Sequence, residues 1–67
     1  MYPNLLAEMA RAGVRQKMLL PIIGRTSEAG LSRKMNEPGG FTLEEAFKIK
    51  SAVAPGVPLE VLFKWED

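Results

Sequence analysis

Glycine and proline divide this chain into short segments, and this punctuation limits the folds that it can adopt. Helix-breaking residues recur at Gly13, at Gly24, in the stretch Glu37-Pro38-Gly39-Gly40 and at Pro55-Gly56. Between them, apolar residues recur three and four positions apart, without the alternation typical of strands. A chain of 67 residues has room for one hydrophobic core. The sequence therefore predicts a single all-α domain over residues 1–67, a compact bundle of four to five short helices.

The expected helices have recognisable ends. Their predicted ranges are residues 4–12, 16–23, 27–36, 43–53 and 58–63. Asn4 suits the N-cap of the first helix, and Ser27 or Thr26 suits that of the third. Thr42 and Glu45 have the spacing of a capping box at the start of the fourth helix. Pro58 is expected at the first position of the last helix.

The core is expected to draw on methionine, leucine and phenylalanine at helical spacing, because such residues usually fill space between helices. The predicted core residues are Leu31, Met35, Phe41, Phe47, Leu62 and Phe63. Trp65 either closes this core or lies in a dimer contact, and the pattern leaves both open.

The chain contains neither cysteine nor histidine. This excludes disulfides, zinc fingers, thiol nucleophiles and imidazole bases. Glu44 and Glu45 are adjacent and suit a helix cap, so they do not indicate acid–base catalysis. No apolar run approaches the roughly 18 residues of a membrane span, and the N-terminus does not resemble a signal peptide. We expect a cytoplasmic protein that is not an enzyme and needs no metal, cofactor or small-molecule ligand.

Charge is distributed unevenly along the chain. Residues 11–36 carry six bases and the single acid Glu28, a net charge of +5, whereas residues 37–67 carry six acids and three bases, a net charge of −3. A local concentration of positive charge is typical of nucleic-acid-binding proteins. A solvated basic surface without a partner remains the alternative.

Three stretches of the sequence carry a family resemblance. They are Gln16-Lys17-Met18-Leu19 through Gly24, then Leu31-Ser32-Arg33-Lys34-Met35-Asn36, then Phe41-Thr42-Leu43-Glu44-Glu45-Ala46-Phe47-Lys48-Ile49. In this order they resemble the Cro and lambda-repressor-like helix-turn-helix family, particularly small regulators from phages of Gram-positive bacteria. The resemblance covers about residues 4–63. It implies a lambda-repressor-like bundle that binds double-stranded DNA inside a bacterial host cell.

The resemblance also implies a recognition helix, from about Ser27 to Asn36, that lies in the major groove. Its base-reading candidates are Ser27, Glu28, Ala29, Ser32 and Arg33. Arg33 can donate two hydrogen bonds to guanine, Glu28 can accept one from a cytosine amine, and the Ala29 methyl can touch a thymine methyl. Each has a simpler alternative, because Ser27 can serve only as a cap, Glu28 suits the helix dipole and Arg33 can be a solvated surface residue.

Contacts to phosphate are implied for two further regions. The candidates are Gln16 and Lys17 at the start of the second helix, and Lys34, Asn36 and the amides of Gly39 and Gly40 after the third. Gln16 can alternatively be an ordinary surface residue.

The chain departs from the family pattern inside the motif. Pro21 lies in the second helix, where an interior proline removes a hydrogen bond to the carbonyl of Lys17 and predicts a kink or a late helix start. Leu20 replaces the small residue that lets the two helices cross closely. The turn from Gly24 to Leu31 is one residue longer than usual, with Arg25 or Thr26 surplus, and Gly30 adds flexibility to the third helix.

The sequence therefore predicts a sequence-specific DNA-binding transcriptional regulator. One small reading helix buries little surface, so a homodimer on a pseudo-palindromic operator is expected. The alternative is a helix-turn-helix scaffold used for protein binding, such as a phage-encoded inhibitor or adaptor. Fold resemblance alone does not choose between the two.

Overall fold

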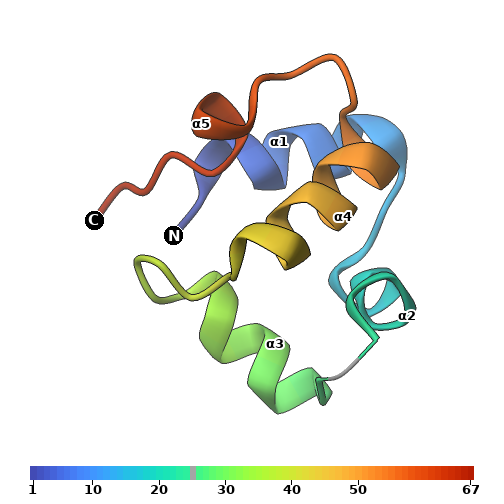
Figure 1. The fold of residues 1–67 in the computed structure, drawn as a ribbon, viewed down its shortest axis with the longest axis vertical. Coiled ribbons are helices and arrows are strands. Elements are labelled where there is room, and N and C mark those ends of the chain that lie inside the picture. The colour runs from blue at the N-terminus through green and yellow to red at the C-terminus, as the bar shows by residue number, and fades with distance from the viewer. Residues whose placement is uncertain (25) are drawn as a thin grey trace.

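Five α-helices and one 3-10 helix make up the computed structural model, which describes residues 1–24 and 26–67 (Figure 1). The elements are α1 (Pro3–Ala12), η1 (Gln16–Met18), α2 (Leu19–Ile23), α3 (Glu28–Met35), α4 (Leu43–Val53) and α5 (Leu59–Leu62). No strand occurs in these residues. The predicted all-α bundle is confirmed, and α4 lies at its centre, in contact with α1, α2 and α5.

The helix ends follow the expected local chemistry at most positions. Gly13 and Gly24 end α1 and α2 in the left-handed conformation, with φ of 69° and 87°, which glycine adopts without steric cost. The Ser27 hydroxyl accepts a hydrogen bond from the Gly30 amide at 3.1 Å. The Thr42 hydroxyl accepts from the Glu45 amide at 3.2 Å, and a Glu45 carboxylate oxygen accepts from the Thr42 amide at 3.0 Å. The predicted caps of α3 and α4 are therefore confirmed.

The predicted N-caps of the first and last helices need correction. α1 begins one residue earlier than expected, at Pro3, because proline has the backbone angle of a first helical position and needs no amide partner there. Asn4 is thus inside the helix, where its side-chain amide donates to the Val61 carbonyl at 2.9 Å and links α1 to α5. Pro58 is the cap of α5 rather than its first residue.

The second predicted helix is divided in two, which confirms the late helix start expected from Pro21. The chain forms a 3-10 turn at η1, and α2 then starts at Leu19, so Pro21 is only its third residue. The carbonyls of Gln16 and Lys17 accept hydrogen bonds from backbone amides at the end of η1. The expected loss of a partner for the Lys17 carbonyl is therefore wrong, because the 3-10 pattern supplies one.

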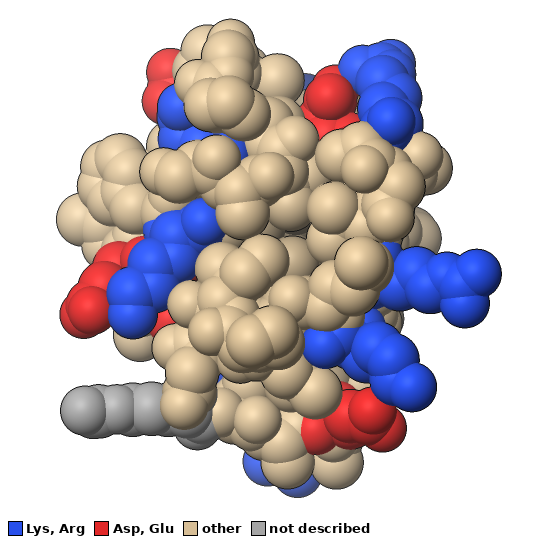
Figure 2. Space-filling view, turned by 90° about the vertical axis from the view of Figure 1, so that its right-hand side faces the viewer, with Lys and Arg blue, Asp and Glu red and all other residues tan. Residues whose placement is uncertain are grey.

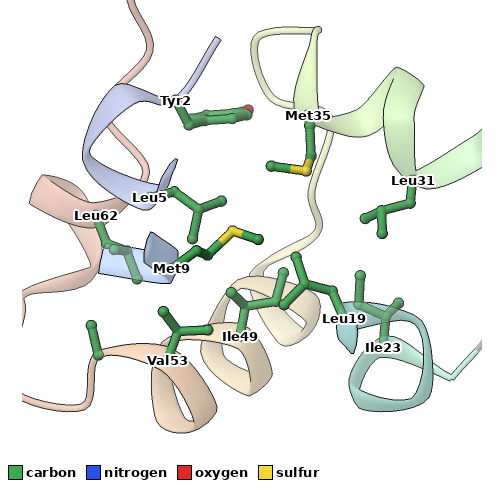
Figure 3. Packing of buried hydrophobic residues seen from close by; sticks show 11 residues of the cluster. Tyr2, Leu5, Met9, Leu19, Ile23, Leu31, Met35, Ile49, Val53 and Leu62 are labelled. Carbon is green, nitrogen blue, oxygen red and sulfur yellow. The ribbon is translucent and has the colours of Figure 1, made fainter. Parts of the chain in front are cut away.

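All five α-helices contribute to the core, whose side chains converge in Figure 3. The side chains with no more than 1% of their surface exposed are Leu5, Leu19, Leu31, Ile49 and Leu62. The core predictions for Leu31, Met35 and Leu62 are confirmed, and Phe41 and Phe63 are half-buried against the cluster.

The core prediction for Phe47 is wrong, since its side chain is 51% exposed. On α4 the buried positions are Ala46, Ile49 and Val53, three and four residues apart. Phe47 follows Ala46 directly and is therefore rotated by about 100° away from this stripe.

Aromatic side chains join the two ends of the described chain. Tyr2 is buried, and its ring centroid lies 5.7 Å from that of Phe63 and 5.2 Å from that of Trp65. The Tyr2 hydroxyl donates to the Glu37 carbonyl at 2.9 Å and accepts from the Gly39 amide at 3.1 Å. Tyr2 thus fixes the loop that follows α3, and Trp65 helps to close the core. None of the described helices is long and apolar enough to cross a membrane.

Candidate nucleic-acid interface

One side of α3 is exposed while the other anchors it to the core. Leu31 and Met35 are buried, four residues apart. The base-reading candidates Ser27, Glu28, Ala29, Ser32 and Arg33 are all exposed. Helix α3 is therefore held against the core by one face and exposes polar residues to solvent on the other. Ser27 also caps the helix, as its simpler interpretation expects.

The start of η1 lies beside the start of α3. A hollow of about 400 Å³ is lined by Arg15, Gln16, Lys17, Glu28 and Leu31. Gln16 and Lys17, the phosphate candidates from the second predicted helix, are thus brought next to Glu28, a base-reading candidate. We use the name η1–α3 surface for Arg15, Gln16, Lys17 and the exposed residues of α3.

The η1–α3 surface is positively charged. Arg15, Lys17 and Arg33 are exposed and oppose only Glu28. Figure 2 looks onto α2 and shows Lys and Arg side chains on both sides of a largely uncharged centre, with Asp and Glu side chains beside several of them. None of the ion pairs among the described residues involves Lys17 or Arg33. Their charges are therefore available to an anionic partner.

Arg15 is one of the six bases in residues 11–36, and the sequence pattern assigns it no contact. Its place in the hollow makes it a third cation at the edge of α3. The signal in the sequence is its position directly before Gln16, where the chain enters η1 in extended conformation.

Lys34, by contrast, is already engaged inside the protein. Its ammonium lies 3.0 Å from a Glu45 carboxylate oxygen and 3.3 Å from the Gly40 carbonyl, and its side chain is only 26% exposed. Burial raises the pKa of Glu45, but the hydrogen bond from the Thr42 amide and the neighbouring Lys34 outweigh it and hold that pKa below its ordinary value of 4.5. The pair connects the end of α3 to the start of α4.

The remaining phosphate candidates also have partners within the chain. The Asn36 side-chain amide donates to the Ser32 carbonyl at 2.8 Å. The Gly39 amide donates to the Tyr2 hydroxyl at 3.1 Å, and the Gly40 amide donates to the Glu37 carbonyl at 3.2 Å. These groups shape the loop after α3, and we do not include them in the η1–α3 surface.

The departures from the family pattern have local explanations. Leu20 is half-buried and packs on the core. A side chain at Gly30 would place its first carbon 2.6 Å from the Thr26 hydroxyl, so glycine makes room for the turn before α3. The turn before α3 is predicted to contain one surplus residue, Arg25 or Thr26. Of these two, Arg25 lies outside the described residues.

Comparison with protein-family models, with curated proteins and with solved structures finds no match to this chain. Function therefore has to follow from the geometry and chemistry of the surface. In the described part of the chain, no three carboxylates gather closely enough to hold a metal ion. This side of the molecule carries the exposed cations Arg15 and Lys17 near the start of α3.

Proposed function

We propose that this protein binds double-stranded DNA as a transcriptional regulator, with α3 in the major groove and η1 against the phosphate backbone. The observation that carries the proposal is the η1–α3 surface, where Glu28 of α3 adjoins Arg15 and Lys17 in one hollow and the other candidate residues of α3 are exposed. A major groove about 12 Å wide admits one helix, whose first residues meet base edges. The eight residues of α3 span about 12 Å.

The residues of this surface then divide into two roles. Arg33, Glu28 and Ala29 read base edges by donating to guanine, accepting from cytosine and touching a thymine methyl. Arg15, Gln16 and Lys17 contact phosphates, which position the helix and carry little sequence information. The positive charge for these contacts comes from Arg15, Lys17 and Arg33. All three side chains are exposed, so contacts with DNA do not disturb the core.

The proposal includes the oligomeric state, which is a homodimer on DNA. A single copy of a small reading helix buries less surface than specific recognition usually needs. Two copies on a pseudo-palindromic operator, acting in the cytoplasm of a bacterial host, supply two reading helices on one face of the duplex.

A salt titration tests this function. The affinity for a fluorescently labelled mixed-sequence duplex is measured by anisotropy between 50 and 200 mM salt, a range in which phosphate contacts dominate. Two phosphate contacts from Arg15 and Lys17 predict that log K falls with log salt at a slope of about −2 per copy. The variant Arg15→Ala/Lys17→Ala should lose most of this slope.

Lys64→Ala is the matched control, because Lys64 is an exposed cation in the chain after α5 and not on the η1–α3 surface. It should bind as the unaltered protein does. Absence of salt-dependent binding, or equal losses in both variants, would contradict the proposal and favour a scaffold that binds protein instead.

A further inference from the structure

A second surface, formed by α4, α5 and the chain ends, is apolar. It contains a hollow of about 380 Å³ whose lining includes Tyr2, Phe41, Leu59, Phe63 and Trp65. Phe41 and Phe63 pack edge to face, with their ring centroids 5.4 Å apart. We call this the aromatic hollow. It shares no lining residue with the hollow of the η1–α3 surface.

One exposed apolar side chain lines the aromatic hollow, and a second lies one helical turn away on the same helix. Leu43, which lines it, is 66% exposed, and Phe47 is 51% exposed. They are four residues apart on α4 and therefore lie on the same face of that helix. Exposed apolar residues that adjoin one another, rather than lying singly, indicate an interaction site.

We propose that the aromatic hollow receives Leu43 and Phe47 of a second copy of this chain, so that the two copies form a symmetric dimer. A two-fold axis brings the same patch of both copies together, which requires that one patch carry both the projecting and the receiving elements. Here Leu43 lines the aromatic hollow, and Phe47 is exposed one helical turn further along the same face of α4.

Charge at the edge of this surface favours a protein partner over DNA. Glu60 lines the aromatic hollow, and Glu44 lies next to Leu43. These carboxylates repel phosphates. The Lys48 ammonium and a Glu44 carboxylate oxygen, 3.4 Å apart, form an exposed ion pair on the same helix, and an identical copy could exchange partners with this pair across the two-fold axis.

The size of the molecule fits a side-by-side dimer on DNA, a step that rests on the proposed function. The Cα atoms span 26 × 24 × 20 Å. Side chains add about 3 Å on each side, so two copies in contact have centres about 26–32 Å apart, depending on the axis along which they meet. The upper end of this range approaches the spacing of 34–36 Å between adjacent half-sites.

The available area also predicts how stable the dimer is. A standard interface buries about 800 Å² on each partner, and an aromatic side chain buries about 150–250 Å². Phe47, Leu43 and the partly exposed rings supply the centre of such an interface but little beyond it. The dimer should therefore dissociate on dilution and be reinforced when both copies hold one duplex.

The test uses the full chain without DNA, so that its result does not depend on the proposed function. Sedimentation equilibrium over a range of concentrations gives the dimer dissociation constant. Trp65 is the sole tryptophan and lines the aromatic hollow, so its emission should shift to the blue as the dimer forms. The variant Leu43→Glu/Phe47→Glu should weaken dimerisation at least about tenfold and abolish the shift.

Leu6→Glu is the matched control, since Leu6 is an exposed apolar residue of α1 that does not line the aromatic hollow. It should leave both readouts unchanged, and circular dichroism should show that all variants keep their helices. A protein that stays monomeric at every concentration, or a dimer that persists in Leu43→Glu/Phe47→Glu, would overturn the proposal. A blue shift of Trp65 only on addition of a heterologous protein would overturn it as well.

Discussion

Replacing Lys34 with methionine should destabilise the fold. Its ammonium bonds the Glu45 carboxylate at 3.0 Å and the Gly40 carbonyl at 3.3 Å, which fastens α3 to the start of α4. Methionine keeps the apolar stem of the side chain but none of its hydrogen bonds. The change in the free energy of unfolding therefore reports the contribution of the polar interactions of Lys34.

The size of the effect follows from the exposure of the pair. Fully exposed ion pairs contribute about 0.2–1 kcal/mol, and hydrogen bonds to charged groups about 1.5–3 kcal/mol. The side chains of Lys34 and Glu45 are 26% and 17% exposed, which lies between these cases. We expect a loss of about 1–2 kcal/mol, or a fall in Tm of about 5–15 °C for a domain of this size.

Urea denaturation followed by circular dichroism measures this loss. Lys48→Met is the matched control, because Lys48 and Glu44 form an ion pair at 3.4 Å whose side chains are 47% and 80% exposed. Its effect should stay below about 0.5 kcal/mol.

The pH dependence provides a second readout of the same pair. Because the folded-state pKa of Glu45 is lowered, its contribution to stability is present above 4.5 and is lost as the pH falls through the folded-state pKa. The unaltered protein and Lys34→Met should therefore converge in stability under acidic conditions. A difference that is negligible at neutral pH, or that persists unchanged in acid, would refute this account of Lys34.

Three further predictions concern the second and third predicted helices. Arg33→Ala should relax the preference for one base pair by about 1–3 kcal/mol in a selection from randomised duplexes, while stability changes by less than about 0.5 kcal/mol; an equal loss on every sequence would make Arg33 a phosphate contact. Lys17→Ala should weaken binding uniformly and reduce the salt slope by about one unit, and an unchanged slope would place Lys17 off the interface. Pro21→Ala should alter the free energy of unfolding by less than about 1 kcal/mol, because Pro21 lies in the first turn of α2, where its missing amide has little to bond; a gain near the roughly 3 kcal/mol cost of an interior proline would show that η1 and α2 prefer to form one helix.

The helix ends could be predicted from the sequence because they depend on local chemistry. Gly13 and Gly24 end their helices, and Ser27 and Thr42 begin theirs, because each acts through backbone angles or hydrogen bonds within a few residues. Phe47 was misplaced because its side chain differs from that of a core residue only in its angle around α4. The angle follows from the position of Phe47 in the chain, but the side of α4 that faces the core depends on the neighbours that α4 meets, and the sequence pattern does not show them.

In the candidate site, too, exposure along one helix could be predicted from the sequence, whereas contacts between two helices could not. Exposure of Glu28 and Arg33 follows from the period of α3, whose other face holds Leu31 and Met35. The engagement of Lys34 with Glu45, eleven residues away, depends on how α3 and α4 meet. The sequence shows a lysine on a basic helix but not the carboxylate that this lysine meets, and the phosphate contact expected of Lys34 stays a prediction.

The junction of Tyr2 with Phe63 and Trp65 also constrains when this protein can fold during its synthesis. Related links include the bond between Asn4 and Val61, which are 57 residues apart. A ribosome that adds about 5–20 residues per second needs roughly 3–12 s to make that interval. During this time α1 has no α5 to pack against, so the nascent chain remains open to proteases and chaperones. Closure of the core is thus a late event that waits for Trp65 to leave the ribosome.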